Sequence, residues 1–154
     1  MIKKKILLLL IFFSLASCSY NPIYSNKSFS NFSVSKIQTS GDAEINRKIG
    51  SLLNIKEGNN LENSYTLSII SKKDKATVAK DNLGNVSIFK ISVQVFVTIF
   101  DSLDPENIIK TKEFSSTYSY NNIKNKFDLS QKEKDIENNL IESIAQEIII
   151  FLHS

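Results

Sequence analysis

The residues with the clearest potential for chemistry lie near the start of the chain, where Leu15-Ala16-Ser17-Cys18 follows a short apolar run. Three consecutive lysines at positions 3–5 precede an apolar stretch over positions 6–15, and small residues come directly before the cysteine. This order is typical of a bacterial secretory signal that ends in a lipobox. We therefore expect export of the chain, cleavage before Cys18, and covalent attachment of lipid to its sulfur.

Other interpretations of this segment fit it less well. An apolar helix of ten residues spans about 15 Å, whereas the hydrocarbon core of a bilayer is roughly 30 Å thick. A plain signal peptide with an incidental cysteine is an alternative, since both kinds of signal require small residues at the cleavage site. Each acyl chain contributes roughly 0.8 kcal/mol per buried CH₂, so the several chains of a bacterial lipoprotein anchor it stably.

Length, charge and cysteine content limit the class of protein. Removal of positions 1–17 from the 154 residues leaves 137, which fits one domain with a true core. The three lysines of the signal account for the formal net charge of +3, so the mature chain is formally neutral and shows no sign of nucleic-acid binding. With one cysteine, a disulfide framework is impossible.

The chain divides into three parts by composition. Residues 1–17 form the cleaved signal, residues 18–29 form a lipidated N-terminus and a Ser- and Asn-rich tether, and residues 30–154 form a single domain. The tether contains Pro22, which favours an extended backbone.

The periodicity of the domain predicts the order strand, helix, three strands, helix. A weak strand is expected over Asn31–Ile37, and a short helix is capped by Asp42 and carries one apolar stripe. That stripe consists of Ile45, Ile49, Leu52 and Leu53. A strand over Ser64–Ser71 is expected to end in a charged turn or edge at Lys72–Lys75, with a second arm at Ala76–Lys80.

The later elements show clearer signals. Asp81–Asn85 has the composition of a turn. Alternate apolar residues from Phe89 to Ile99 predict a strand with one buried face, although Phe96 and Phe100 fall on its polar face. A turn at Asp104–Asn107 leads into a strand over Ile109–Asn121.

A polar loop is expected over Asn121–Asp128. Ser130 and Glu133 fit a capping box that opens the last helix, whose stripe runs from Ile136 to Leu152. The sequence thus predicts an α+β fold in which two helices pack on one face of a mostly antiparallel sheet of about four strands.

The usual catalytic and metal-binding constellations are missing. His153 is the only histidine and lies next to the C-terminus, and no free thiol accompanies it. The glycines occur at positions 41, 50, 58 and 84, never in a phosphate-binding pattern. We expect neither catalytic activity, nor a cofactor, nor a metal site.

The ordered set of motifs resembles the LPS-assembly lipoproteins of the LptE family. Cys18-Ser19-Tyr20-Asn21-Pro22-Ile23-Tyr24 is similar to the Cys-Gly-Phe-x-Pro-Leu-Tyr start of that family, with Ser19 in place of glycine. Arg47–Leu53 is similar to its first helix, and Tyr65–Ile69 to its next strand. Residues from Asp81 to Asp101 are similar to its central hairpin, and the last helix to its C-terminal part, without a long C-terminal tail.

The resemblance implies a structural partner rather than a catalyst. Family members sit as a plug inside the outer-membrane β-barrel LptD, assist its assembly, and contact lipopolysaccharide in transit to the cell surface. It implies a lipid-anchored, periplasm-facing location at the outer membrane of a Gram-negative bacterium. The absence of Asp at position 19 is compatible with that location.

Two sets of candidate binding residues follow. Lys80 is similar to a basic position at the tip of the family's hairpin, and Lys124 and Lys126 lie in another basic region of the family. We expect these lysines to form one basic end that contacts lipopolysaccharide phosphates, the alternative being ordinary solvated lysines. Tyr118 and Tyr120 are candidates for the partner interface, the alternative being core packing.

Two other classes of function remain as alternatives. The chain could be a lipoprotein adaptor of another envelope machine, such as an ABC-transport auxiliary or a secretion pilot protein. It could also be an enzyme on a lipid tether, which the missing catalytic residues disfavour.

Overall fold

The computed structural model describes residues 33–58 and 64–154. The described residues form one compact unit. The signal segment, Cys18 and the tether therefore lie outside the described residues. Among the helices that the structure describes, none is both long enough and apolar enough to cross a membrane.

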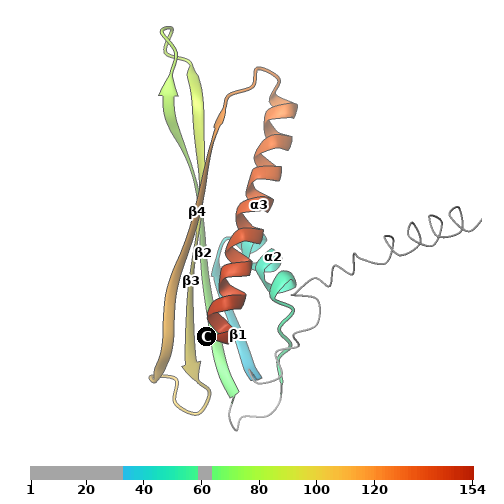
Figure 1. The fold of residues 1–154 in the computed structure, drawn as a ribbon, viewed down its shortest axis with the longest axis vertical. Helices are drawn as coiled ribbons and strands as arrows, with labels where there is room; N and C mark the ends of the chain where they lie inside the picture. The colour runs from blue at the N-terminus through green and yellow to red at the C-terminus, as the bar shows by residue number, and fades with distance from the viewer. Residues whose placement is uncertain (1–32, 59–63) are drawn as a thin grey trace, which may run out of the picture. The chain divides into compact units, whose positions relative to one another are not determined.

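Four strands and two helices make up the domain. Their order is β1 (Ser33–Gly41), α2 (Ala43–Leu53), β2 (Ser64–Lys80), β3 (Val86–Asp101), β4 (Ile108–Asn121) and α3 (Lys126–His153). The sheet has the spatial order β1-β2-β3-β4. β1 is parallel to β2, and the other neighbouring pairs are antiparallel. Both helices lie on the same side of the sheet (Figure 1), so the predicted α+β architecture and element order are confirmed.

The core lies between this helix-bearing face and the two helices. Alternate residues of β3, from Ile91 to Ile99, are almost completely buried on that face. α3 contributes Ile141, Ile144 and Ile148, all fully buried. The buried face of β3, formed by its alternate residues, therefore packs against the apolar stripe of α3, as the sequence predicts.

Helix α2 follows β1 through a tight corner. Gly41 has a φ of +90°, and a Cβ at this position would overlap the Ser71 carbonyl oxygen. Asp42 caps the helix by accepting hydrogen bonds from the backbone N–H groups of Glu44 and Ile45, at 3.0 and 3.1 Å. The predicted cap is confirmed.

The predicted stripe of α2 is correct at three of its four positions. Ile45, Ile49 and Leu53 are buried, whereas Leu52 is 44% exposed. The three buried residues are spaced by four, and Leu52 falls at the rim of the face that they define.

Three other boundary predictions are wrong. β1 runs from Ser33 to Gly41 rather than over positions 31–37, and a bulge between Val34 and Lys36 interrupts its alternation. β2 continues without a turn through Lys72–Lys75 to Lys80, but it has no β1 partner beyond Ser71, so the alternative prediction of a sheet edge at Lys72–Lys75 is confirmed. α3 begins at Lys126 with Asn125 as its N-cap, so Ser130 lies inside the helix and no capping box opens there.

Candidate functional site

The three candidate lysines lie toward one end of the domain, which we call the hairpin end (residues 76–90 and 121–128). Lys80 is the last residue of β2 and pairs with Val86, at the start of β3. Asn122 follows β4 directly, and its side-chain amide donates to the Val86 carbonyl at 2.7 Å while its backbone N–H donates to Ser87 at 2.8 Å. These bonds hold the start of the loop that carries Lys124 against the hairpin.

The structure refines the predicted setting of these lysines. Lys124 lies in the loop as expected, whereas Lys126 is the first residue of α3. Lys80, Lys124 and Lys126 are exposed, and none makes an ion pair with a described residue. Two acidic residues, Asp81 and Asp128, lie at the same end. The hairpin end is therefore of mixed charge, with the lysines outnumbering the acids among these five residues.

The tip of the hairpin has a defined conformation. Asp81 accepts hydrogen bonds from the backbone N–H groups of Leu83 (2.9 Å) and Asn85 (2.8 Å), and Gly84 has a φ of +82°. The Asn85 backbone N–H is the main cause that holds the pKa of Asp81 below its usual value. Asp81 therefore keeps its charge in the turn, and the turn signal in the sequence is confirmed.

Tyr120 lies in the core and links β4 to α3. Its side chain is 4% exposed, and its hydroxyl donates to Glu133 Oε1 at 2.7 Å. Burial and then the hydrogen bond to Glu133 raise the pKa of Tyr120. Tyr118 is different because it is 53% exposed, so it is the one of the two predicted interface tyrosines that a partner can reach directly.

Two lysines of β2 connect the sheet to α3 beside this tyrosine. Lys75 Nζ lies 2.6 Å from Glu133 Oε1 and 4.4 Å from the centroid of the Phe89 ring. Lys73 Nζ lies 3.0 Å from Glu137 Oε2. Burial opposes ionisation of Glu133, but the hydrogen bonds from Lys75 and Tyr120 outweigh it and lower its pKa. The segment Lys72–Lys75 therefore belongs to strand β2, and two of its lysines form ion pairs with α3.

The opposite face of the sheet carries no helix, and we call it the open face (Figure 1). Its side chains alternate with the buried ones along β2, β3 and β4. They are mostly hydroxyl and amide groups, represented by Ser68, Ser92, Gln94, Thr98, Thr111, Ser115 and Thr117. Cross-strand bonds between them are long, such as Thr98 Oγ1 to Thr111 Oγ1 at 3.1 Å. Four charged side chains lie among them, at Lys72, Asp74, Lys90 and Glu113.

An apolar pair interrupts the polar surface of the open face. Ile70 and Phe96 are directly paired across β2 and β3, and they are 48% and 42% exposed. Phe100 lies on the same face and is half-buried. The prediction that Phe96 and Phe100 fall on the polar side of β3 is therefore confirmed.

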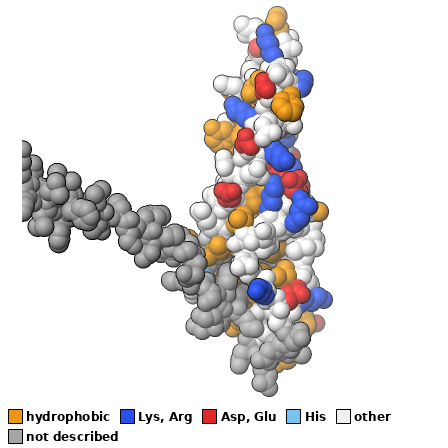
Figure 2. Space-filling view, turned by 90° about the vertical axis from the view of Figure 1, so that its right-hand side faces the viewer, with side chains coloured by type: hydrophobic (Ala, Val, Ile, Leu, Met, Phe, Trp, Pro, Cys, Tyr) orange, Lys and Arg blue, Asp and Glu red, His pale blue; other side chains and the backbone are white. Residues whose placement is uncertain are grey.

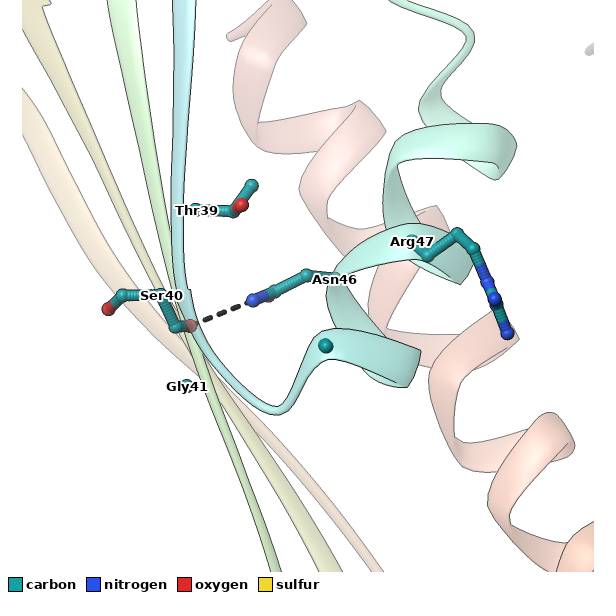
Figure 3. Close-up of a pocket in the computed structure, with 6 residues that line it drawn as sticks. Thr39, Ser40, Gly41, Asn46 and Arg47 are labelled. Carbon is teal, nitrogen blue, oxygen red and sulfur yellow. Dashed lines mark hydrogen bonds between the residues drawn. The ribbon is translucent and has the colours of Figure 1, made fainter.

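A depression of about 340 Å³ lies between the end of β1 and the start of α2 (Figure 3). The Asn46 side-chain amide donates to the Ser40 carbonyl at 2.8 Å, while Arg47 extends away from β1 (Figure 3). Asn46 Oδ1 is buried and has no hydrogen-bond partner among the described residues. Because that oxygen is inaccessible, we assign Asn46 a structural role, as the tie between β1 and α2.

The structure shows no candidate metal centre: no group of three or more His, Cys, Asp or Glu residues is suitably placed within residues 33–58 and 64–154. The predicted lipidation site, Cys18, lies outside this part. Periodicity does not identify the exposed Phe127 and Leu83, since neither belongs to an apolar stripe. The only local signal for them is their position beside the capping residues Asn125 and Asp81.

No protein-family model matches this sequence, and no curated protein matches it. Several solved structures are similar in fold. Rare lipoprotein B from Shewanella oneidensis is 14% identical with a TM-score of 0.59, and the match covers 77% of this chain and 93% of that one. Uncharacterized lipoprotein B from Nitrosomonas europaea is 15% identical with a TM-score of 0.58, covering 80% and 85%.

A third structure extends this comparison. A minor lipoprotein from Acinetobacter baumannii is 15% identical with a TM-score of 0.54, and the match covers 75% of this chain and 89% of that one. At these identities the likeness concerns the fold. The domain therefore has the fold of several bacterial lipoproteins, over most of their length.

Proposed function

We propose that this chain is a non-catalytic, LptE-like lipoprotein of the outer membrane that acts in lipopolysaccharide assembly. In this proposal Cys18 carries the lipid anchor, and the domain sits as a plug inside an LptD-type β-barrel whose assembly it assists. The likeness in fold to bacterial lipoproteins supports the coarser part of the proposal, a lipid-anchored envelope protein.

The observation that supports a β-barrel as the partner is the composition of the open face of the sheet. A sheet face free of helices is normally polar where it meets water. Here a face of mainly hydroxyl and amide groups, with a few charged side chains such as Glu113 among them, surrounds the exposed apolar pair Ile70 and Phe96. Such a surface matches the polar interior of a large barrel, while an aromatic side chain supplies an anchor at the interface.

The lysines of the hairpin end supply the proposed ligand contact. Lipopolysaccharide carries phosphates, and lysine binds phosphate as a point charge. Lys80, Lys124 and Lys126 have no described ion-pair partner to compete for them. They are consistent with a contact to the phosphorylated part of the molecule.

The test is affinity purification of the lipidated protein from its own membranes, followed by mass-spectrometric identification of what co-purifies. We expect a stoichiometric large β-barrel protein. Phe96→Lys removes the aromatic anchor of the open face and should reduce recovery of the barrel about tenfold, because loss of a central aromatic contact is among the costliest changes at an interface. Glu147→Lys, at an exposed position of α3, is the matched control and should retain it.

Two results would overturn the proposal. Recovery of inner-membrane transporter subunits in place of a barrel would favour an adaptor of another envelope machine. Equal recovery of the barrel with Phe96→Lys and with the wild type would remove the open face as the contact surface. Circular dichroism of both variants checks that each is folded.

A further inference from the structure

Two of the sheet edges in the described part of the chain are protected against pairing with another strand. On the outer side of β1, the Gly58 N–H donates to the Val34 carbonyl at 2.8 Å, and Glu57 Oε1 accepts the Ile37 N–H at 2.7 Å. β2 has no β1 partner beyond Ser71. That part of its edge carries charged side chains, at Lys72, Lys73, Asp74 and Lys75. Covering segments and edge charges are the usual means by which a sheet avoids pairing with other chains.

The outer edge of β4 has neither kind of protection over its second half. β4 is the last strand of the sheet, and its backbone makes no hydrogen bond to a described residue outside β3. In an antiparallel pair, the N–H and C=O groups of every second residue face away from the partner strand. From Phe114 to Asn121 the strand contains no charged residue, no proline and no glycine. This segment, which we call the β4 edge, is therefore open to a further strand.

The helix-bearing side of the domain is less suited to contact with another copy of the chain. Lys, Arg, Asp and Glu side chains are distributed along its length, with hydrophobic side chains between them (Figure 2). A mixture of both charges is typical of a solvated protein surface. Association through this side would remove charges from water, whereas backbone pairing at the β4 edge would not.

We infer that the β4 edge pairs in antiparallel orientation with the same segment of a second copy of this chain, with Thr117 at the centre. The pairing joins the two four-stranded sheets into one continuous sheet. It does not rest on the proposed function, because it uses the edge of the sheet, whereas the proposed barrel contact uses the open face.

Symmetry and charge together select the register. A two-fold axis between antiparallel neighbours is perpendicular to the sheet, so one residue lies opposite itself. With Thr111 at the centre, Lys110 would lie opposite Lys112, and like charges in direct pairs are destabilising. Thr117 gives the longest pairing that keeps both lysines outside it, with Glu113 opposite Asn121 at each end.

The side chains on the open face are self-complementary in this register. Thr117 lies opposite Thr117 of the second copy, and Ser115 lies opposite Ser119. A hydroxyl pair of the same kind already joins two strands within the domain, where Thr98 Oγ1 and Thr111 Oγ1 are 3.1 Å apart. Such threonine pairs stabilise neighbouring strands.

The helix-bearing face contributes an aromatic contact. Tyr118 pairs with Ile91 of β3, which places it on this face, and it is 53% exposed. In the paired sheets it lies opposite Ser116 and diagonal to Tyr118 of the second copy. Diagonal neighbours are about 7–8 Å apart, within reach of aromatic side chains. The pairing therefore covers a ring that the single domain leaves exposed.

Disulfide cross-linking of the full lipidated protein, purified in detergent, tests the contact directly. Thr117→Cys should give a disulfide-linked dimer on oxidation, because opposite residues in antiparallel strands have Cα atoms about 4.5–5.5 Å apart. Thr111→Cys is the matched control on the same face of β4, and its two copies would lie about 40 Å apart. Cys18 is the only native cysteine, so oxidised wild-type protein measures the background.

Two charged variants at the centre test the register independently. Position 117 is exposed in the single domain, which should therefore tolerate either charge. Thr117→Lys and Thr117→Glu each place like charges opposite each other and should weaken self-association about fivefold in sedimentation velocity. An equimolar mixture should associate at least as strongly as the wild type, because Lys then faces Glu. A general loss of folding would not give this rescue.

Three results would overturn the inference. The first is a Thr117→Cys protein that cross-links no more than the wild type or than Thr111→Cys. The second is a mixture of the charged variants that associates no better than either variant alone. The third is cross-linking of position 117 to a different polypeptide in place of a second copy, which would assign the β4 edge to that partner.

The affinity purification keeps this inference separate from the proposed function. Recovery of a barrel without any cross-link at position 117 would overturn only the pairing between copies. A specific cross-link at position 117 without any barrel in the purification would support the pairing and remove only the proposed partner.

Discussion

Substitution of Gly41 by alanine is expected to be the most damaging single methyl addition at the described glycines, and its cost has two separable parts. The first is conformational, since Gly41 has a φ of +90° and a non-glycine residue in a sparsely populated region costs about 1–3 kcal/mol. The second is steric, since the new Cβ would overlap the Ser71 carbonyl oxygen.

The steric part forces the end of β1 away from β2. That movement breaks the hydrogen bond from the Asp42 backbone N–H to the Ser71 carbonyl at 3.2 Å, and that from Ser71 Oγ to the Asp42 carbonyl at 3.1 Å. Ser71 is 3% exposed, and a buried polar group without a partner costs about 1–3 kcal/mol. Gly41→Ala should therefore lower the free energy of unfolding by about 2–6 kcal/mol in all.

Urea denaturation followed by circular dichroism, on the chain from Ser19 onward, measures this difference. Gly84→Ala is the matched control: its φ is +82°, but a Cβ there meets nothing within 4 Å. It should cost only the conformational part, about 1–3 kcal/mol. Equal losses for the two variants would refute the steric argument, and with it the close approach of Gly41 to Ser71.

Three further predictions concern the helix contacts. Asp42→Ala removes the acceptor of two N–H groups in the first turn of α2 and should cost about 1 kcal/mol, whereas Asp42→Asn should cost little; urea midpoints measure both. Tyr120→Phe removes one hydrogen-bond donor to Glu133, while Lys75 still donates to the same carboxylate. The free energy of unfolding should therefore fall by about 1 kcal/mol, as measured in urea. The pKa of Glu133 in the folded state lies below its usual value of 4.5. The stabilisation that ionised Glu133 adds to the free energy of unfolding should therefore be present above about pH 4.5, and be lost as the pH falls through the folded-state pKa. Glu133→Gln should abolish that part of the acid dependence in urea titrations between pH 3 and 6, and an unchanged profile would contradict the assignment.

The elements with strong local signals could be predicted from the sequence. The alternation in β3, the stripe of α3 and the cap at Asp42 each depend on residues within one element, and each is confirmed. The turn at Asp81–Asn85 also depends on local chemistry, since Asp81 bonds to the N–H groups that follow it.

The boundaries that depend on distant partners could not be predicted in this way. Lys73 and Lys75 have the composition of a turn, yet β2 continues through them because they pair with Val93 and Ile91 of β3. Their side chains also donate to Glu137 and Glu133 of α3, which lie 64 and 58 residues later in the chain. Pairing with another strand and contacts with a distant helix override local propensity, and only the fold reveals them.

The start of α3 was predicted wrongly for a different reason. Asn125 as N-cap with Asp128 in the first turn was a signal available in the sequence, and Leu129 already belongs to the buried face. The Ser130–Glu133 pattern competed with it, but Glu133 bonds to Tyr120 and Lys75 instead of to a cap. A capping motif predicts a helix start only where no earlier residue already extends the apolar face.

The packing of the sheet against the helices changes along its length, and this change explains why the proposed binding residues at the hairpin end are free of the core. Toward the middle, the sheet and helices meet through fully buried side chains such as Val95 and Ile144. Farther along, α3 is held by Lys73 and Lys75 through ion pairs that are partly exposed and that contribute less than apolar burial. Beyond Ile88, which pairs with Asn121, only β2 and β3 continue, and a two-stranded ribbon alone is marginal in water. The turn itself keeps its conformation through the hydrogen bonds of Asp81 with Leu83 and Asn85, so the hairpin end projects beyond the packed core without contributing to it, and its side chains are available for recognition.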